Sequence, residues 1–86
     1  MSSLDSLKAL ANENRLKLVK ELSKGKALTV TDAAELLRIT IAAASRHLQI
    51  LEDAGILTHV KRGQNVAYRM KVAGIEGWVK AVLKEL

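Results

Sequence analysis

Few side chains in this sequence have the type and spacing that catalysis or metal binding requires. Ser45 and His47 could be a nucleophile and its base, but on a helix their side chains diverge by about 200° and no third triad member is present. His47 and His59 have no thiolate or carboxylate beside them at ligand spacing, and the chain contains no cysteine. We therefore expect no enzyme, no metal site and no cofactor. His47 should pack or cap near the core, and His59 should lie on a strand.

Hydrogen bonding to nucleic acid fits the segment 40–54 better. At helical spacing, Ala44, Leu48 and Leu51 fall on one side of this segment. Arg46 and Gln49 fall opposite, where an arginine can bind guanine or phosphate and a glutamine can bind adenine. The helix residues predicted to contact DNA in the major groove are Thr40, Ile41, Ala42, Ala43, Ser45, Arg46 and Gln49. Only two of them are long and polar, so phosphate contacts and DNA shape should supply much of the binding.

A basic turn follows this helix. Residues 56–62 and 65–71 are predicted to be two strands around it. The second has the alternation of a half-buried strand, with Val66, Tyr68 and Met70 inward and Ala67, Arg69 and Lys71 outward. A turn of this kind can lie along the DNA backbone or enter the minor groove. Its predicted contact residues are Lys61, Arg62, Gly63, Gln64 and Asn65.

Capping signals predict where the first three helices begin and end. A short first helix carries the apolar residues of segment 4–11, and Asn12 can cap a second helix that ends near Gly25. Thr29 followed by Asp32 resembles a capping box, which predicts a third helix of about two turns.

The third and fourth helices form a helix-turn-helix pair. Only Arg38 and Ile39 separate the third helix from Thr40, which can cap a fourth helix that runs through Ala54 and stops at Gly55. With the hairpin and a last helix, the sequence predicts one domain over residues 1–86. Its fold class is mainly α with a small β-hairpin, a winged helix-turn-helix of four helices, two strands and a fifth helix.

The first and last helices carry apolar stripes that need a partner surface. A chain of this length hides only about 60% of its unfolded-state surface as a monomer, so pairing two chains through apolar helices would complete the core. The residues predicted at a homodimer interface are Leu4, Leu7, Leu10, Ile75, Trp78, Val79, Val82, Leu83 and Leu86.

The net charge of +5 is concentrated in the second half of the helix-turn-helix and in the hairpin. Residues 38–71 hold six basic and two acidic side chains, and such a concentration favours binding to phosphates. The sequence contains no apolar signal run and no stretch of about 18 apolar residues that would span a membrane. We therefore expect a cytoplasmic, nucleoid-associated protein.

Three segments closely resemble the ArsR/SmtB-type winged helix-turn-helix repressors: ALANENRLKLVKEL, LTVTDAAELLRIT and ASRHLQILEDAGILTHVKRGQNVAYRM. The resemblance covers about residues 7 to 71. It implies a homodimer built from the first and last helices, with the fourth helix in the major groove of double-stranded DNA and the wing beside it. Members of the family typically repress operons and release DNA when a metal or another inducer binds.

The metal switch of the family is not expected here. Metal sensors begin the third helix with a Cys-Val-Cys-Asp type motif, whereas both thiolate positions in this chain hold threonine, Thr29 and Thr31. The last helix offers only Glu76 and Glu85 for the other common metal position. Arg38 stands where the family often has glycine in the turn.

The sequence favours a sequence-preferring DNA-binding regulator, a repressor, and leaves two alternatives open. One is a protein-interaction module that uses the alanine-rich segment 42–44 against a protein partner. The other is a poorly selective, chromatin-like DNA-binding protein. The operator, the sign of regulation and any inducer or protein partner are not specified by the sequence.

Overall fold

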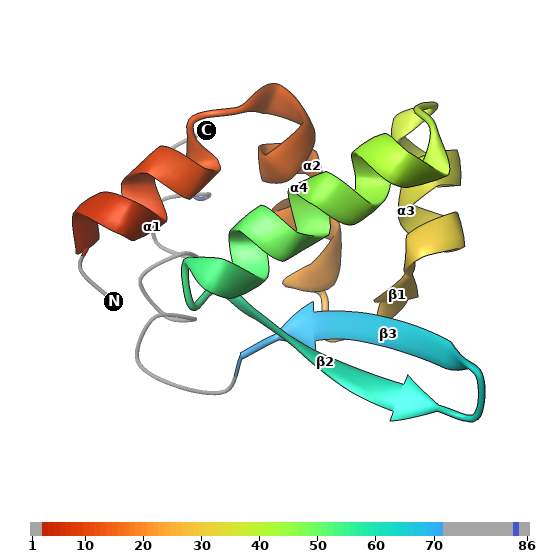
Figure 1. Ribbon diagram of the computed structural model, residues 1–86. Coiled ribbons are helices and arrows are strands. Elements are labelled where there is room, and N and C mark those ends of the chain that lie inside the picture. The colour runs from red at the N-terminus through yellow and green to blue at the C-terminus, as the bar shows by residue number, and fades with distance from the viewer. Residues whose placement is uncertain (1–2, 72–83, 85–86) are drawn as a thin grey trace.

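The computed structural model describes residues 3–71 and Lys84. Helix α1 (Ser3–Leu10) and helix α2 (Glu13–Leu22) are separated by two residues (Figure 1). The side-chain oxygen of Asn12 accepts the backbone N–H of Arg15 at 3.1 Å, which confirms the predicted N-cap of α2. Gly25 lies three residues beyond the end of α2, in the turn that follows, with φ +91°.

The predicted capping residues also start the next two helices. Strand β1 (Leu28–Thr29) leads into α3 (Val30–Leu37), and α4 covers Ile41–Asp53. Thr29 and Asp32 form the full capping box, since each accepts the backbone N–H of the other at 3.1 and 3.0 Å. The hydroxyl of Thr40 accepts the backbone N–H of Ala43 at 3.1 Å and so caps α4.

Helices α3 and α4 end in the same backbone motif with different residues at its left-handed position. At the end of α4, Gly55 has φ +80° and its N–H donates to the carbonyl of Glu52. At the end of α3 the equivalent residue is Arg38, with φ 57° and ψ 47° and its N–H bonded to the carbonyl of Glu35. In both ends the next N–H reaches back five residues, the Schellman pattern. Glycine adopts this conformation freely, whereas for arginine it costs about 1 kcal/mol or more.

The three strands form an antiparallel sheet in the order β1, β3, β2. Strands β2 (Leu57–Arg62) and β3 (Asn65–Met70) form the predicted hairpin, which turns at Gly63 with φ +63°. The sheet contains a third strand, β1, that the sequence did not predict. A strand of two residues is too short to show the alternation of polar and apolar residues by which strands are recognised. Ala67 shares a face of β3 with Arg69, as the alternation predicts, but it is only 5% exposed because it lies in the central strand between Thr29 of β1 and Val60 of β2.

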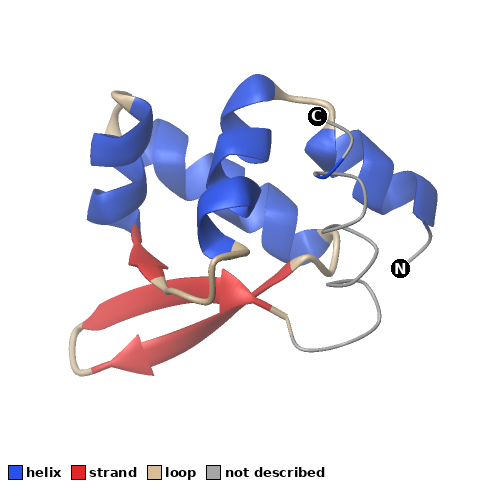
Figure 2. Ribbon diagram, turned by 180° about the vertical axis from the view of Figure 1, so that it is seen from behind, coloured by secondary structure: helices blue, strands red, loops and turns tan. Residues whose placement is uncertain are grey.

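The helices lie on one face of the sheet, and the core fills the space between them (Figure 2). Its largest fully buried side chains come from α2, α4 and the start of the wing: Leu18, Val19, Leu22, Leu48, Leu51, Ile56 and Leu57. This arrangement confirms the predicted winged helix-turn-helix fold. The predicted last helix lies outside the described residues. Within the part that the structure describes, no helix is long and apolar enough to cross a membrane.

Candidate nucleic-acid interface

Helix α4 has a buried side and an exposed side, as its sequence predicts. Ala44, Leu48 and Leu51 are each 0% exposed and anchor the helix in the core. Of the residues predicted to contact DNA, Thr40, Ile41, Ala42, Arg46 and Gln49 are exposed, and Ala43 and Ser45 are half-buried. The first turn of α4 holds no acidic residue of its own that would repel phosphate from its positive dipole end. This end of the helix can therefore approach a polyanion.

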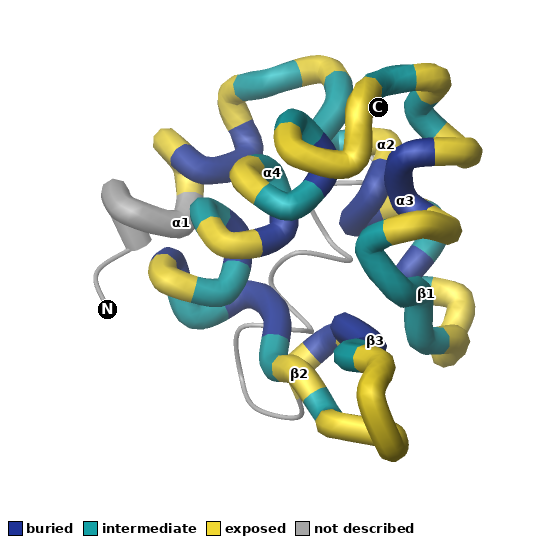
Figure 3. Tube along the Cα trace, turned by 45° about the vertical axis from the view of Figure 1, so that its right-hand side comes forward, coloured by how far each residue is buried: buried dark blue, intermediate teal, exposed yellow. Residues whose placement is uncertain are grey.

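The wing presents the second predicted set. Lys61, Arg62, Gly63, Gln64 and Asn65 are all exposed, and the tip of the hairpin appears entirely in the exposed class (Figure 3). The N-terminal end of α4 and the tip of the wing lie toward the same side of the molecule, on the right in Figure 1 and on the left in the reverse view of Figure 2. Both sets can therefore face one ligand.

The sheet register adds a cation that the predicted contact set did not include. Arg62 pairs with Asn65, and Arg69 pairs with Thr58, so Arg62 and Arg69 project from the same face of the hairpin. Arg69 and the following Lys71 are both exposed. The sequence had placed Arg69 outward by alternation, but only the pairing of the strands shows that it shares a face with Arg62.

A half-buried arginine of α2 joins α4 to α1. The Nε of Arg15 donates to the backbone carbonyl of Ala9 on α1 at 2.5 Å, and its Nη1 donates to Nδ1 of His47 on α4 at 3.2 Å. Burial lowers the pKa of His47 below its ordinary value, and the neighbouring charges of Arg15 and Arg46 lower it further. His47 is therefore neutral at pH 7, and the prediction that it packs near the core is confirmed.

A second polar contact ties the wing to the other end of α4. Nδ1 of His59 on β2 contacts the carboxylate of Glu52 on α4, and the His59 ring lies 5.9 Å from the ring of Tyr68. Burial raises the pKa of Tyr68, and the charge of Glu52 adds to this effect. His59 is the strand residue that the sequence predicted. The hydrogen bonds of Arg15 therefore join α4 to α1 and α2, and the contact between His59 and Glu52 joins α4 to β2.

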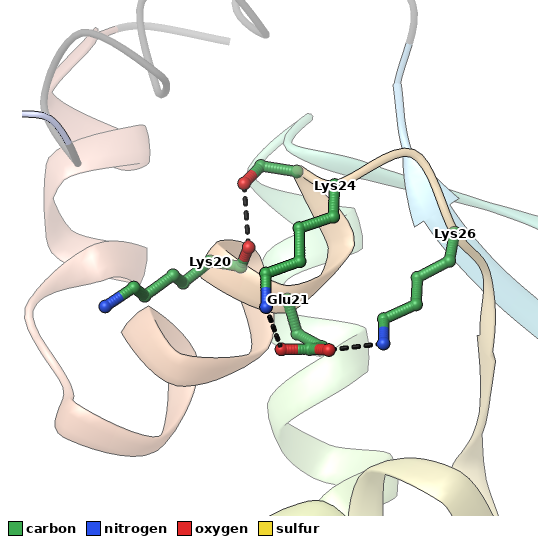
Figure 4. A network of polar contacts seen from close by, with 5 residues as sticks. Lys20, Glu21, Lys24 and Lys26 are labelled. Carbon is green, nitrogen blue, oxygen red and sulfur yellow. Dashed lines mark hydrogen bonds and ion pairs between the residues drawn. The ribbon is translucent and has the colours of Figure 1, made fainter.

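One acidic side chain pairs with both lysines of the loop that follows α2. Glu21 pairs with Lys24 at 3.1 Å and with Lys26 (Figure 4), and these lysines hold the pKa of Glu21 below its ordinary value, Lys26 most strongly. Lys20 extends away from this carboxylate. Because Glu21 compensates one of these positive charges, the loop adds less to a nucleic-acid surface than Lys24 and Lys26 suggest.

Threonines occupy the two positions where the metal sensors of the resembled family carry cysteine ligands. The hydroxyl of Thr29 accepts the capping hydrogen bond of α3, and Thr31 is exposed. Among the described residues, no group of three or more histidine, cysteine, aspartate or glutamate side chains could hold a metal ion.

The predicted dimer residues are only partly within the described structure. Leu7 is 48% exposed on α1, as an unpartnered apolar residue would be, whereas Leu10 is 4% exposed and packs in the core of its own chain. Leu10 therefore has little side-chain area left for a second subunit. The other predicted residues lie outside the described side chains: Leu4, Ile75, Trp78, Val79, Val82, Leu83 and Leu86.

Comparison with known proteins places this geometry in a family. A helix-turn-helix domain model matches residues 10–60. The chain is 34% identical over 74 residues to the transcriptional repressor PagR of Bacillus anthracis, covering 86% of this chain and 74% of PagR. It is 36% identical over 63 residues to a CadC homolog of Staphylococcus aureus, a cadmium resistance transcriptional regulatory protein, covering 73% of this chain. The chain spans 52% of the length of that relative.

The solved structures agree in fold. The homodimeric winged helix-turn-helix DNA-binding domain of Mb0332 from Mycobacterium bovis, described as a possible ArsR-family transcriptional regulator, aligns with a TM-score of 0.77 and 29% identity. The alignment covers 95% of this chain and 78% of that one. These relatives confirm the expectation of a regulator family as opposed to an enzyme family. The chain belongs to the ArsR/SmtB-type winged helix-turn-helix regulators.

Proposed function

We propose that this protein is a cytoplasmic, nucleoid-associated transcriptional repressor that binds double-stranded DNA as a homodimer. Helix α4 enters the major groove with Thr40, Ile41, Ala42, Ala43, Ser45, Arg46 and Gln49 toward the bases and the groove walls. The wing residues Lys61, Arg62, Gly63, Gln64 and Asn65 lie along the backbone or in the minor groove beside it. The repression by PagR supports the sign of regulation, and the homodimer of Mb0332 supports the assembly.

The division of α4 into two sides carries this proposal. Its inner residues are fully buried, so its outer residues are held in a fixed helical array with Arg46 and Gln49 exposed. A rigid helix that offers a fork of guanidinium donors and an amide matches the donor and acceptor pattern of the major groove. The exposed cations of the wing add the phosphate contacts that hold such a helix in register.

The dimer would complete the binding site. Two copies of α4 related by a two-fold axis engage successive major grooves about 34 Å apart, on a pseudo-palindromic operator. The exposed Leu7 on α1 is the described part of the proposed interface, which continues through the last helix. Release from DNA would not use the thiolate site of the metal sensors, because Thr29 and Thr31 replace its cysteines.

The test is a binding measurement with the full chain. An operator is selected from a random duplex pool, and its affinity is compared with that of random duplex at about 150 mM salt. We expect a clear preference for the selected operator, a loss of that preference in Arg46→Ala, and weaker binding to every sequence in Arg62→Ala. The matched control is Lys20→Ala, which removes one exposed charge from α2, outside the proposed contact set.

A protein-interaction role is the second candidate function, and two exposed apolar side chains favour it. Leu36 on α3 and Ile41 on α4 are 44% and 54% exposed, so the helix-turn-helix offers some apolar area to a protein. If the chain fails to bind any duplex at low salt, the DNA-binding proposal is wrong and this candidate replaces it. Binding with a steep salt dependence and no operator preference would instead show the chromatin-like activity.

A further inference from the structure

The left-handed arginine of the helix-turn-helix turn has no structural reason to be an arginine. The ends of α3 and α4 share one hydrogen-bond pattern, in which the left-handed residue is Arg38 in the first and Gly55 in the second. Within residues 3–71, Arg38 is the only residue other than glycine with positive φ. Since glycine makes the same motif without strain one helix later, the backbone does not require arginine at this position.

No hydrogen bond or ion pair of the Arg38 side chain within residues 3–71 offsets this backbone strain. The residue is exposed, and none of the ion pairs or side-chain hydrogen bonds within residues 3–71 includes its guanidinium. Arg15 shows the contrast, because its guanidinium is half-buried and donates to two partners in the same chain. A strained, exposed residue whose side chain makes no hydrogen bond or ion pair within residues 3–71 is a candidate for a contact with a ligand.

The position of Arg38 identifies the chemistry of that contact. Arg38 lies in the turn between α3 and α4, two residues before Thr40, the N-cap of α4. The N-terminal end of α4 lies toward the same side of the molecule as the tip of the wing (Figure 1). When a helix enters the major groove by its N-terminal end, the residues just before its first turn reach the wall of the groove. That wall is made of phosphates, and an arginine fork binds a phosphate through two parallel hydrogen bonds.

We propose that Arg38 binds a DNA phosphate at the edge of the major groove and anchors the N-terminal end of α4 against the backbone. The inference rests on the proposed DNA-binding function and adds to it a residue outside the contact set on α4 and the wing. In a homodimer each subunit supplies one such contact.

The experiment separates the strain of Arg38 from its charge. Arg38→Gly and Arg38→Asn remove the charge and fit the left-handed conformation better than arginine does, so neither should unfold the protein. Arg38→Lys keeps the charge and the strain but loses the fork. The full-length variants are titrated with a fluorescent duplex of mixed sequence at about 50 to 300 mM salt, and their thermal midpoints are measured in parallel. Lys20→Ala is the charge-matched control.

We expect Arg38→Gly to raise the thermal midpoint by a few degrees while it weakens DNA binding. One phosphate contact contributes a slope of about 0.9 to the dependence of log affinity on log salt, which corresponds to about fivefold in affinity at 0.15 M salt. Two subunits therefore lower the slope by about two and the affinity by about 25-fold. Arg38→Asn should behave alike, and Arg38→Lys should keep most of the slope.

The outcomes distinguish this inference from the function on which it rests. If the parent binds DNA and Arg38→Gly and Arg38→Asn bind with its affinity and salt slope, the phosphate contact is wrong and the proposed function stands. A loss of affinity with an unchanged slope would assign the effect to the geometry of the turn and would also overturn the contact. If the parent itself does not bind duplex DNA, the proposed function fails together with the inference.

Discussion

Replacing Arg15 by methionine should lower the free energy of unfolding by about 2 kcal/mol, because two hydrogen bonds from a charged donor are lost. One acceptor is the carbonyl of Ala9, whose residue is 4% exposed, and the other is Nδ1 of the half-buried His47. A hydrogen bond to a charged group contributes about 1.5–3 kcal/mol, and solvent at this half-exposed site replaces part of the pair. Methionine keeps the apolar stem, so the packing changes little.

The assay is urea unfolding followed by far-ultraviolet circular dichroism at constant protein concentration. Lys17→Met is the matched control, because Lys17 lies on the same helix with a 60% exposed side chain and pairs with Glu13 only at 3.8 Å. It should change stability by less than about 0.5 kcal/mol. A double-mutant cycle with His47→Leu should give a coupling of about 1 kcal/mol. An Arg15→Met cost no larger than that of Lys17→Met, or an additive cycle, would refute the link between α2 and α4.

Three further predictions follow from local features. The pKa of His47 is lowered in the folded state, so the unfolded chain binds the proton of this side chain more tightly. The free energy of unfolding should therefore fall as the pH drops below about 6.5. Urea titrations at several pH values should show a smaller fall in His47→Gln. Gly63→Ala should lower the thermal midpoint through about 1 kcal/mol of backbone strain, because Gly63 has φ +63°. An added Cβ would meet nothing within 4 Å, so no clash adds to this cost. Gly63→Asn should cost less, and equal midpoints for the parent and Gly63→Ala would contradict the left-handed turn. Thr40→Ala should cost about 1 kcal/mol in urea unfolding by removing the cap of α4, and Thr40→Ser should restore it.

The helices could be predicted because their ends are set by neighbouring residues. Thr29 with Asp32, Thr40 with Ala43, and Asn12 with Arg15 each form a cap across three residues, and a sequence displays such spacing directly. The exposed face of α4 follows from the same local periodicity, because Ala44, Leu48 and Leu51 recur at helical intervals. The exposed face of α4 can therefore be predicted from the sequence alone.

The features that the sequence did not predict depend on residues far apart in the chain. Strand β1 exists because Leu28 and Thr29 pair with Tyr68 and Ala67, and two residues carry no periodicity of their own. The hydrogen bond from Arg15 to His47 joins positions 32 residues apart, and no spacing rule indicates it. The shared face of Arg62 and Arg69 likewise depends on the register of the hairpin. Each of these contacts is set by tertiary packing, which local pattern does not report.

The contacts of α4 also bear on how the proposed dimer would hold this helix in position for DNA. Arg15 bonds α4 to the C-terminal end of α1, and the exposed Leu7 of α1 lies on the proposed subunit interface. A helix that is held to its neighbour by a charged hydrogen bond follows that neighbour when it moves, because breaking the bond leaves a half-buried guanidinium with fewer partners. The proposed contact of Arg46 with DNA would therefore depend on how α1 packs against its neighbours. If the link matters in this way, Arg15→Met should weaken operator binding more than binding to random duplex, because only the operator requires both copies of α4 in register. An equal loss on both DNAs would show that Arg15 stabilises the fold without orienting the reading helix.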